Sequence, residues 1–261
     1  MSHGTEVLSD RHEHLAILTL NRPWARNALN FDLLYLLLSE LEGLSADESL
    51  RCLVITGSGI NAFCAGADLK ERLVLMPEQR TAHTSAINDA ANALEQFPVP
   101  VIAAIRGFAL AGGAELATAC DLRVISDDGM IGFPEVHVGV FPGGGGVIRL
   151  PRLIGAGKAR DLLFTGRRVG AAEALGMGLV DRVVPNDKVM PAAVALAGEI
   201  AAGAPLAIQA MKRSLNESVG LSASDAQGMV SRLRVPLDVT SDYDEGLRAF
   251  AERRSPQFKG K

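Results

Sequence analysis

The sequence predicts an α/β fold followed by a helical C-terminal region. Strand-like and helix-like stretches alternate over the first two thirds of the 261 residues, which is typical of sheets whose strands are at least partly parallel. From Ala156 onward the pattern is almost entirely helical, and Val180–Val184 is the one stretch there that we expect to be a strand. Hydrophobic residues make up 48% of the chain, so a sizeable core can be buried.

The first strand is expected at His14–Leu20, where apolar and polar residues alternate after a polar start. Short apolar runs bounded by turn residues predict further strands at Cys52–Ile55, Val101–Ile105, Leu122–Ser126 and Met130–Phe133. Helical patterns in the same part of the chain are Phe31–Leu44, Glu78–Phe97 and a short turn at Glu115–Cys120, which follows a loop at Gly107–Gly113.

The later helices are expected from their composition and from the glycines and prolines that separate them. They are Ala156–Phe164, Ala171–Leu175, Met190–Ala202, Pro205–Ser218 and two more that extend to Arg254. No sequence repeat or low-complexity linker interrupts the chain, so the change to helical character is the one candidate boundary.

Charge and cysteine content exclude several classes of protein. The net charge of −4 and a pI of about 5.8 argue against a nucleic-acid-binding surface, which is normally basic. The three cysteines, Cys52, Cys64 and Cys120, form no CxxC pair, so neither a disulfide framework nor a zinc site is expected. A reducing compartment suits this pattern.

No segment has the pattern of a signal peptide or a membrane span. Met1–Glu13 is polar and lacks an apolar core. Phe97–Cys120 is the least charged long stretch, but it contains two prolines together with Arg106 and Glu115. We therefore expect a soluble, cytoplasmic protein that binds neither nucleic acid nor a membrane.

A glycine-bearing turn after the strand at Cys52–Ile55 matches a dinucleotide-binding pattern loosely. Gly57–Ala62 has the required spacing with alanine last, but it leads into a second small-residue loop, Phe63–Asp68, instead of a helix. The pattern therefore favours an ordinary turn over a dehydrogenase site.

Two loops of small residues can bring backbone N–H groups close to a ligand. One is Phe63–Lys70 and the other is Ile105–Leu116, which runs into a helix start, where free N–H groups suit an oxyanion. Glu115 lies in the second loop among apolar neighbours. The local sequence leaves open whether its carboxyl group caps its own helix or does acid–base chemistry.

A second carboxyl group, that of Glu135, lies among apolar residues before four consecutive glycines, Gly143–Gly146. Apolar flanks favour close backbone approach or a tight helix entry over a flexible loop. Burial raises the pKa of a carboxyl group, and a neighbouring carboxylate raises one of the pair further. Glu115 and Glu135 could therefore act as base and acid.

The histidines carry less information. His3, His12 and His14 are expected in solvent, His83 on a helix surface and His137 as a candidate for pocket lining. No two of them have the spacing of metal ligands, and no metal site is expected.

Several segments taken in order resemble the crotonase (enoyl-CoA hydratase/isomerase) family. They are Leu18–Pro23, Arg26–Leu29, Phe63–Leu69, Pro100–Gly107, Ala111–Leu116, Phe133–Glu135, Pro142–Gly146, Phe164–Gly166, Gly178–Val180, and Phe250 with Arg253. The likeness covers nearly the whole chain, and although each piece is weak, the ordered set is highly specific.

The resemblance implies a crotonase-like spiral of ββα units over residues 1–198 and a C-terminal helical trimerisation region over residues 199–261. It also implies an acyl-CoA thioester substrate and a homotrimer, or a homohexamer made of two trimers. No cofactor is expected, since CoA is part of the substrate.

The family's oxyanion hole maps onto the backbone N–H groups of Ala67 and Gly112, and its two glutamates map onto Glu115 and Glu135. In the implied hydratase mechanism, Glu115 takes a proton from water while Glu135 protonates Cα of a 2-enoyl-CoA. The resemblance places a further set of residues at CoA, namely Arg26, Ala65, Asp68, Lys70, Phe250 and Arg253, the last two reaching a neighbouring subunit's ligand.

Three residues depart from the family's usual pattern near the acyl pocket: Phe133, His137 and Phe141. Both glutamates favour hydration over the alternatives, a Δ3–Δ2 enoyl-CoA isomerase, which needs Glu135 alone, and a relative that binds acyl-CoA without hydrating it.

Overall fold

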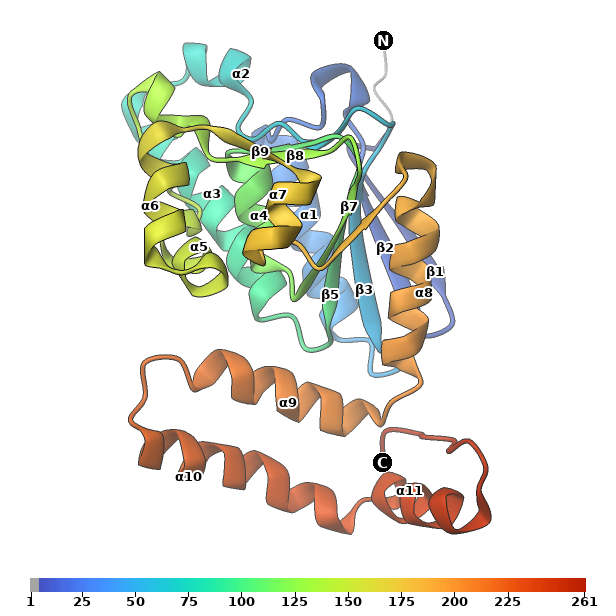
Figure 1. Ribbon diagram of the computed structural model, residues 1–261. Helices are drawn as coiled ribbons and strands as arrows, with labels where there is room; N and C mark the ends of the chain where they lie inside the picture. The colour runs from blue at the N-terminus through green and yellow to red at the C-terminus, as the bar shows by residue number, and fades with distance from the viewer. Residues whose placement is uncertain (1–4) are drawn as a thin grey trace.

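Two sheets form the body of the protein in a computed structural model that describes residues 5–261 (Figure 1). The larger sheet has the strand order β1 (Val7–His12), β2 (Leu15–Leu20), β3 (Cys52–Gly57), β5 (Val101–Ile105), β7 (Leu122–Ser126) and β10 (Arg182–Val184). The smaller sheet has the order β4 (Ala62–Cys64), β6 (Phe108–Leu110), β8 (Met130–Gly132) and β9 (Arg168–Gly170). Every pairing is parallel except β1 with β2 and β8 with β9.

The chain winds as a spiral because consecutive strands alternate between the two sheets. β3 is followed by β4 in the other sheet, then by α2 (Leu69–Val74) and α3 (Pro77–Glu95). β5 is followed in the same way by β6 and α4 (Gly112–Ala119), and β7 by β8. Each turn of the spiral therefore places a new loop and helix beside those of the previous turn.

The first long helix shows how the sequence specifies its own packing. In α1 (Phe31–Ser45), Asn30 caps the N-terminus, since its side chain accepts a hydrogen bond from Leu33 N at 3.1 Å. Leucines at positions 33, 34, 37 and 41 recur at helical spacing and are buried, and this face packs on α3.

The central strands are buried on both faces because helices cover each side of the large sheet. Alternate residues such as Val54 and Ile102 pack under α8 (Val189–Ala201), while Ile55 and Ala103 belong to the main core on the opposite face. Figure 1 shows α8 lying along the sheet, with α1, α3 and α4 on the far side. Burial on both faces explains why these strands are continuous apolar runs.

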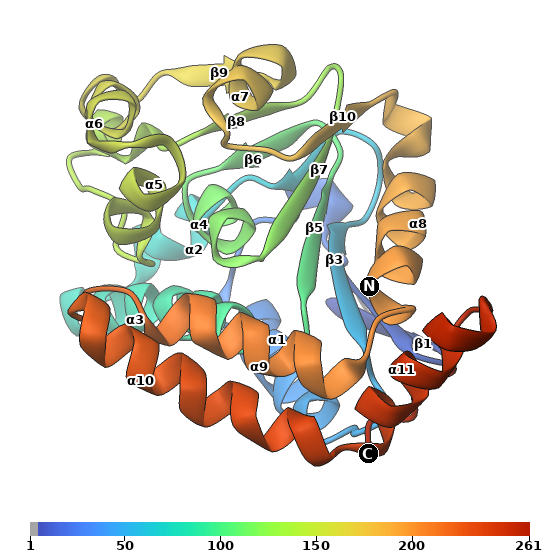
Figure 2. The same ribbon diagram turned by 60° about the horizontal axis from the view of Figure 1, so that its bottom comes forward.

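Three further helices flank the last strand of the small sheet, β9, in the sequence, and three form the C-terminal region. The former are α5 (Gly146–Ile154), α6 (Ala156–Thr165) and α7 (Ala171–Met177), and the latter are α9 (Pro205–Glu217), α10 (Ala223–Arg234) and α11 (Ser241–Glu252). Figure 2 shows α9 and α10 side by side below the sheets. Lys212 of α9 joins this region to the body, because its ammonium group contacts Asp121 at 2.7 Å and Val99 O at 3.0 Å.

The mixed α/β core and the helical C-terminal region confirm the fold class expected from the sequence. The expected boundary between residues 198 and 199 stays a prediction and falls inside α8, whose last residue is Ala201. Several short elements were not expected: β1, β4, β6, β9, α2 and α5. β1 was not predicted because five of its six residues are exposed on an edge strand.

The expectation that His83 lies on a helix surface is wrong. Its side chain is fully buried in α3, where it meets the ring of Phe31 edge-on at 4.9 Å. His12 and His14 are exposed as expected, and His3 lies outside the described residues.

Within residues 5–261, no single helix has both the length and the apolar character to cross a membrane. Asn186–Ala201 and Pro205–Glu217 meet these criteria only as a pair bent by 106°. The same residues contain no cluster of histidine, cysteine and acidic side chains suited to a metal ion.

Packing of α4 against β4 gives a first testable prediction. A Cβ atom at Gly113 would lie 2.3 Å from Cys64 O and 2.7 Å from Cys64 Cβ, and both belong to a buried strand. We expect Gly113→Ala to lower the free energy of unfolding by about 1–3 kcal/mol in urea titrations. Gly176→Ala is the matched control, because nothing lies within 4 Å of its Cβ position in α7, and it should raise stability by about 0.5–1 kcal/mol. Equal effects of the two substitutions would contradict this account.

Candidate active site

A cavity of about 370 Å³ opens where successive turns of the spiral meet. Its lining residues come from the loop before α2, from α2 and α3, from the start of α4 and from the segment after β8: Ala67, Arg72, Thr84, Ile87, Ala111, Gly112, Glu135, Gly139, Val140, Phe141 and Gly143. A separate hollow among α9–α11 is mostly apolar, and its one acid, Asp242, accepts hydrogen bonds from Lys259 N and Gly260 N. The first cavity, in contrast, joins the carboxyl group of Glu135 to a loop of small residues.

Two backbone N–H groups at this cavity have no hydrogen-bond acceptor within residues 5–261. Leu29 and Ala67 pair as an isolated bridge, in which Leu29 N donates to Gly66 O and Asp68 N donates to Leu29 O, both at 2.8 Å, so the N–H of Ala67 is left over. Gly112 is the first residue of α4, where a helical N–H has no partner within its own helix.

The two loops that carry these N–H groups touch each other. Gly66 has φ +92°, and a Cβ atom there would lie 2.7 Å from Ala111 Cβ and 3.1 Å from Gly112 N. Only glycine allows this approach. The sequence expectation that Ala67 and Gly112 act together thus corresponds to neighbouring loops, and such an arrangement can polarise a carbonyl oxygen.

Glu115 lies in the first turn of α4 and is almost fully buried, with 3% exposure. Its Oε1 accepts a hydrogen bond from Gly146 N at 2.9 Å. Burial raises the pKa of this carboxyl group, whereas the backbone of Gly146 and Gly144 and the charge of Arg149 favour its ionised form.

Glu135 lies at the start of a short 3₁₀ helix, Pro134–Val138, and lines the cavity directly. Its Oε2 is buried and has no hydrogen-bond partner in the described part of the chain. Burial raises its pKa to about 7, and the nearby charge of Glu115 adds to this effect. An unpartnered oxygen on a carboxyl group that holds its proton is available to a ligand in the cavity.

The structure brings the two carboxyl groups to the same place, but in different ways. Glu115 does not line the cavity itself but lies next to residues that do. A Cβ atom at Gly144 would lie 2.7 Å from Glu115 Oε2 and 2.9 Å from Ile87 Cγ2, and Ile87 is a lining residue. The Glu115 carboxyl group therefore borders the cavity at Gly144.

The glycine run between the 3₁₀ helix Pro134–Val138 and α5 forms the entry to α5 and packs on both Glu115 and the ring of Phe133. Gly145 precedes α5 in the left-handed conformation, with φ 99°. A Cβ atom at Gly146 would lie 3.0 Å from Phe133 Cε1 and 3.2 Å from Glu115 Oε1. Arg149 fixes the run, since its Nη1 donates to Gly144 O at 2.9 Å while Nη2 contacts Glu95 at 2.6 Å.

The three residues expected at the acyl pocket lie in three environments. Phe141 lines the cavity and is 69% exposed. Phe133 is fully buried behind it, under the glycine run. His137 is exposed and turned toward α6, where a Cβ atom at Gly166 would meet its Nε2 at 2.7 Å, so its side chain lies outside this cavity.

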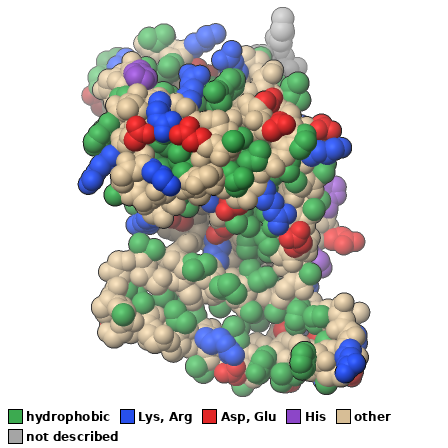
Figure 3. Space-filling model, viewed as in Figure 1, with side chains coloured by type: hydrophobic (Ala, Val, Ile, Leu, Met, Phe, Trp, Pro, Cys, Tyr) green, Lys and Arg blue, Asp and Glu red, His purple; other side chains and the backbone are tan. Residues whose placement is uncertain are grey.

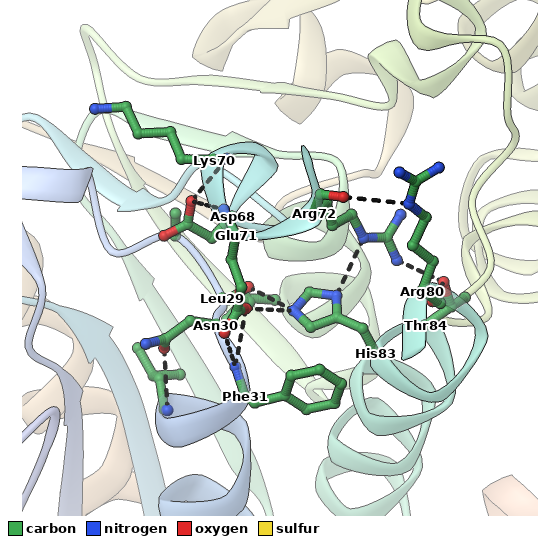
Figure 4. Close-up of polar contacts among 12 residues, drawn as sticks. Leu29, Asn30, Phe31, Asp68, Lys70, Glu71, Arg72, Arg80, His83 and Thr84 are labelled. Atoms are coloured by element: carbon green, nitrogen blue, oxygen red, sulfur yellow. Dashed lines mark hydrogen bonds and ion pairs between the residues drawn. The ribbon is translucent and has the colours of Figure 1, made fainter. Parts of the chain in front are cut away.

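Four of the residues expected at CoA lie around the first loop. Ala65 N donates to Arg26 O at 3.0 Å, which places these two side by side, with the Arg26 side chain exposed. The carboxylate of Asp68 is engaged within the protein, because it caps α2 and contacts Arg22 at 2.9 Å. Lys70 is exposed and extends away from the body of the protein (Figure 4).

The other two, Phe250 and Arg253, are not brought to this cavity within one chain. Phe250 lies on α11 with 86% exposure, and Arg253 caps the same helix. Figure 1 places α11 at the opposite end of the molecule from α2.

Sequence reasoning missed the cation at this cavity. Arg72 lies in α2, a six-residue helix too short for a periodic apolar pattern. The available signal was Asp68 as an N-cap before Leu-Lys-Glu-Arg, since an acidic cap followed by helix-forming residues marks a helix start.

Solved structures share this fold. An enoyl-CoA hydratase from Bacillus anthracis superposes with a TM-score of 0.96 at 38% sequence identity, covering 98% of this chain and all of the other. The protein named DspI from Pseudomonas aeruginosa superposes with a TM-score of 0.94 at 33% identity over 99% and 98% of the two chains. The spiral fold inferred from the sequence is thus that of the crotonases.

Sequence relatives span the whole chain as well. A putative enoyl-CoA hydratase/isomerase of Bacillus subtilis, YngF, is 43% identical over 96% of both proteins, and the 2,3-dehydroadipyl-CoA hydratase of Escherichia coli is 39% identical over 98% of this chain and 100% of its own. The model of the enoyl-CoA hydratase/isomerase family matches residues 10–261. The chain therefore belongs to the enoyl-CoA hydratase/isomerase, or crotonase, family.

Proposed function

We propose that this enzyme hydrates 2-enoyl-CoA thioesters to 3-hydroxyacyl-CoA. The observation that carries the proposal is the pair of buried carboxyl groups, Glu115 and Glu135, at one cavity beside two free N–H groups. Hydration needs a base for the water and an acid for the carbon, and a pair of carboxyl groups in different environments supplies both. The name of the Escherichia coli relative, a hydratase, supports the same reaction.

The thioester carbonyl accepts hydrogen bonds from the N–H groups of Ala67 and Gly112. The carbonyl is conjugated with the Cα–Cβ double bond, so polarising it makes Cβ electrophilic. When water attacks Cβ, negative charge develops on the carbonyl oxygen, and the two donors stabilise that charge. No metal or separate cofactor takes part, because the polarised thioester and the two carboxyl groups supply all the electron and proton movements.

Glu115 acts as the base and Glu135 as the acid. Gly146 N and Arg149 favour the ionised form of Glu115, whereas burial and the charge of Glu115 keep the proton on Glu135. Glu115 takes a proton from water as the water oxygen bonds to Cβ. Glu135 gives its proton to Cα, and the Cα–Cβ double bond becomes a single bond. A proton then passes from Glu115 to Glu135 by way of solvent and restores both groups.

A Δ3–Δ2 enoyl-CoA isomerase is the second candidate, and one observation favours it. Of the two carboxyl groups, Glu135 alone is a lining residue of the cavity. An isomerase needs one group that removes a proton from one carbon and returns it to another, and a pKa of about 7 suits both steps.

We also propose that copies of the chain assemble through the C-terminal region as a homotrimer or homohexamer, with Phe250 and Arg253 beside a neighbour's CoA while Arg26 and Lys70 serve the chain's own. Large apolar side chains are exposed on this region, including Val239 at 90% and Phe250 at 86% (Figure 3). Exposed apolar side chains of this size on one region support an interface. Three buried, unpaired cysteines accord with a reducing, cytoplasmic location.

The paired-carboxyl mechanism predicts the behaviour of two variants. We expect Glu115→Gln and Glu135→Gln each to lower kcat for hydration about 10²–10⁴-fold. The measurement is the loss of enoyl-thioester ultraviolet absorbance with a short trans-2-enoyl-CoA. If Glu115→Gln instead retains full activity in converting a 3-enoyl-CoA to its 2-enoyl isomer while the wild type hydrates nothing, the isomerase is the correct assignment. Binding of the thioester without either reaction would identify a non-hydrating relative.

The two carboxyl environments predict a bell-shaped pH profile of kcat/KM. Activity requires Glu135 protonated, so it should fall as pH rises through about 7. It requires Glu115 ionised, so it should also fall at acid pH, below a pKa that burial has raised above its ordinary value. The two limbs belong to the coupled pair. Activity that keeps increasing from pH 7 to pH 9 would be incompatible with Glu135 as the acid.

Assembly predicts a mass well above that of one 27.5 kDa chain. Light scattering of the full chain should give about three or six times this mass, and Val239→Asp should shift the population toward monomers by placing a charge in the interface. Tyr35→Asp is a control with an exposed aromatic residue on α1 of the body, where the mass should not change. A monomeric wild type would remove the proposed interface.

A further inference from the structure

The cation that lines the cavity, Arg72, has a position that hydration of a simple enoyl chain does not explain. It projects from α2 on the side opposite to Lys70 (Figure 4). Lys70 extends to the exterior, whereas Arg72 is half-buried and lines the cavity together with Glu135 and Phe141. One short helix thus sends one cation outward and the other toward the reacting groups.

Two side chains of α3 hold the guanidinium group in place. Its Nε contacts His83 Nδ1 at 3.1 Å, and its Nη2 contacts Thr84 Oγ1 at 2.5 Å. A guanidinium nitrogen only donates, so His83 Nδ1 is the acceptor and the proton of the neutral ring is on Nε2. That N–H donates to Leu29 O at 3.0 Å.

His83 therefore orients Arg72 without neutralising it. Burial, together with the charge of Arg72, lowers the pKa of His83, so its 3.4 Å contact with Glu71 involves a neutral ring. The Glu71 carboxylate itself accepts from Phe31 N at 3.2 Å. Glu71, the acid in contact with His83, is thus hydrogen-bonded to the start of α1.

The positive charge of Arg72 has no anionic partner among residues 5–261, where it forms no ion pair within 4 Å. Its hydrogen-bonded neighbours are the neutral His83 and Thr84, and a second cation, Arg80, whose Nε donates to Arg72 O at 3.2 Å. Glu115 acts on Arg72 only through its more distant charge. A half-buried cation held by neutral groups at a ligand cavity is suited to an anionic group of the ligand.

The position of the thioester carbonyl decides which part of the ligand that anion belongs to. If Ala67 and Gly112 hold the carbonyl, the acyl group occupies the cavity that Arg72 lines. Lys70, proposed above to serve the CoA, is exposed and does not line this cavity. Resting on the proposed function, we propose that the enzyme prefers enoyl-CoA substrates whose acyl chain ends in a second carboxylate, and that Arg72 binds this carboxylate.

The test compares two substrates with equal numbers of carbons, glutaconyl-CoA, which ends in a carboxylate, and trans-2-pentenoyl-CoA, which ends in a methyl group. Wild type should show the higher kcat/KM for glutaconyl-CoA. In Arg72→Met the ratio of the two values should fall about 10–100-fold, which corresponds to the loss of hydrogen bonds to a charged group. Arg72→Lys keeps the charge but loses the planar fork, so the ratio should fall less.

Arg80→Met is the matched control, because it removes an exposed cation from the same neighbourhood and should leave the ratio at the wild-type value. Equal losses for both substrates in Arg72→Met would overturn the proposal, since Arg72 would then act through Glu115. A wild-type ratio of one or less would overturn it as well.

Calorimetric binding of glutaryl-CoA and pentanoyl-CoA separates this proposal from the proposed function, because neither saturated thioester can be hydrated. Tighter binding of glutaryl-CoA that is lost in Arg72→Met would support the carboxylate site even if the enzyme hydrates nothing. Hydration of trans-2-pentenoyl-CoA together with equal binding of the two saturated thioesters would uphold the hydratase and reject the carboxylate site.

Discussion

Burial of the Glu115 carboxyl group constrains the structure around it. A carboxyl group with 3% exposure is costly unless donors reach it, and Gly146 N reaches it at 2.9 Å. To bring that N–H there, the chain passes so close that a Cβ atom at Gly144 would collide with the carboxylate at 2.7 Å. Arg149 then holds the segment by donating to Gly144 O and by pairing with Glu95. Glu115, the glycine run and Arg149 therefore form one unit, in which the position of each depends on the other two.

The same unit makes the two carboxyl groups chemically different. Glu115 receives the N–H of Gly146 and the field of Arg149, whereas Glu135 has a buried oxygen with no protein donor. Burial raises the pKa of both groups. The backbone of Gly146 and Gly144 and the charge of Arg149 oppose the rise at Glu115, whereas Glu135 has only its own backbone N–H to oppose it. The charge of Glu115 then adds to the effect on Glu135. Burial, to which the charge of Glu115 adds, is thus the reason that Glu135 has a pKa of about 7.

Much of this could be predicted from the sequence, and the exceptions have physical causes. Buried parallel strands such as Val101–Ile105 are unmistakable because both faces are apolar, and the glycine run next to Glu135 signalled close packing. β1 was missed because an exposed edge strand carries no apolar pattern. His83 was predicted to lie on a helix surface because its burial depends on the short helix α2, which packs across it. The sequence around His83 carries no signal of that contact. Contacts between residues far apart in the sequence cannot be predicted from local periodicity.

The spiral explains how residues far apart in the sequence come to share one cavity. Each turn ends beside the previous one, so the first contributes Ala67, Arg72 and Ile87, the next Gly112, and the third Glu135. The N–H groups belong to loops that follow strands of the small sheet, and the glycine run holds Glu115. Arg72 instead belongs to a short helix held mainly by side-chain contacts with α3. Because the two supports are separate, the charge at Arg72 can change while the N–H groups and the acids keep their geometry.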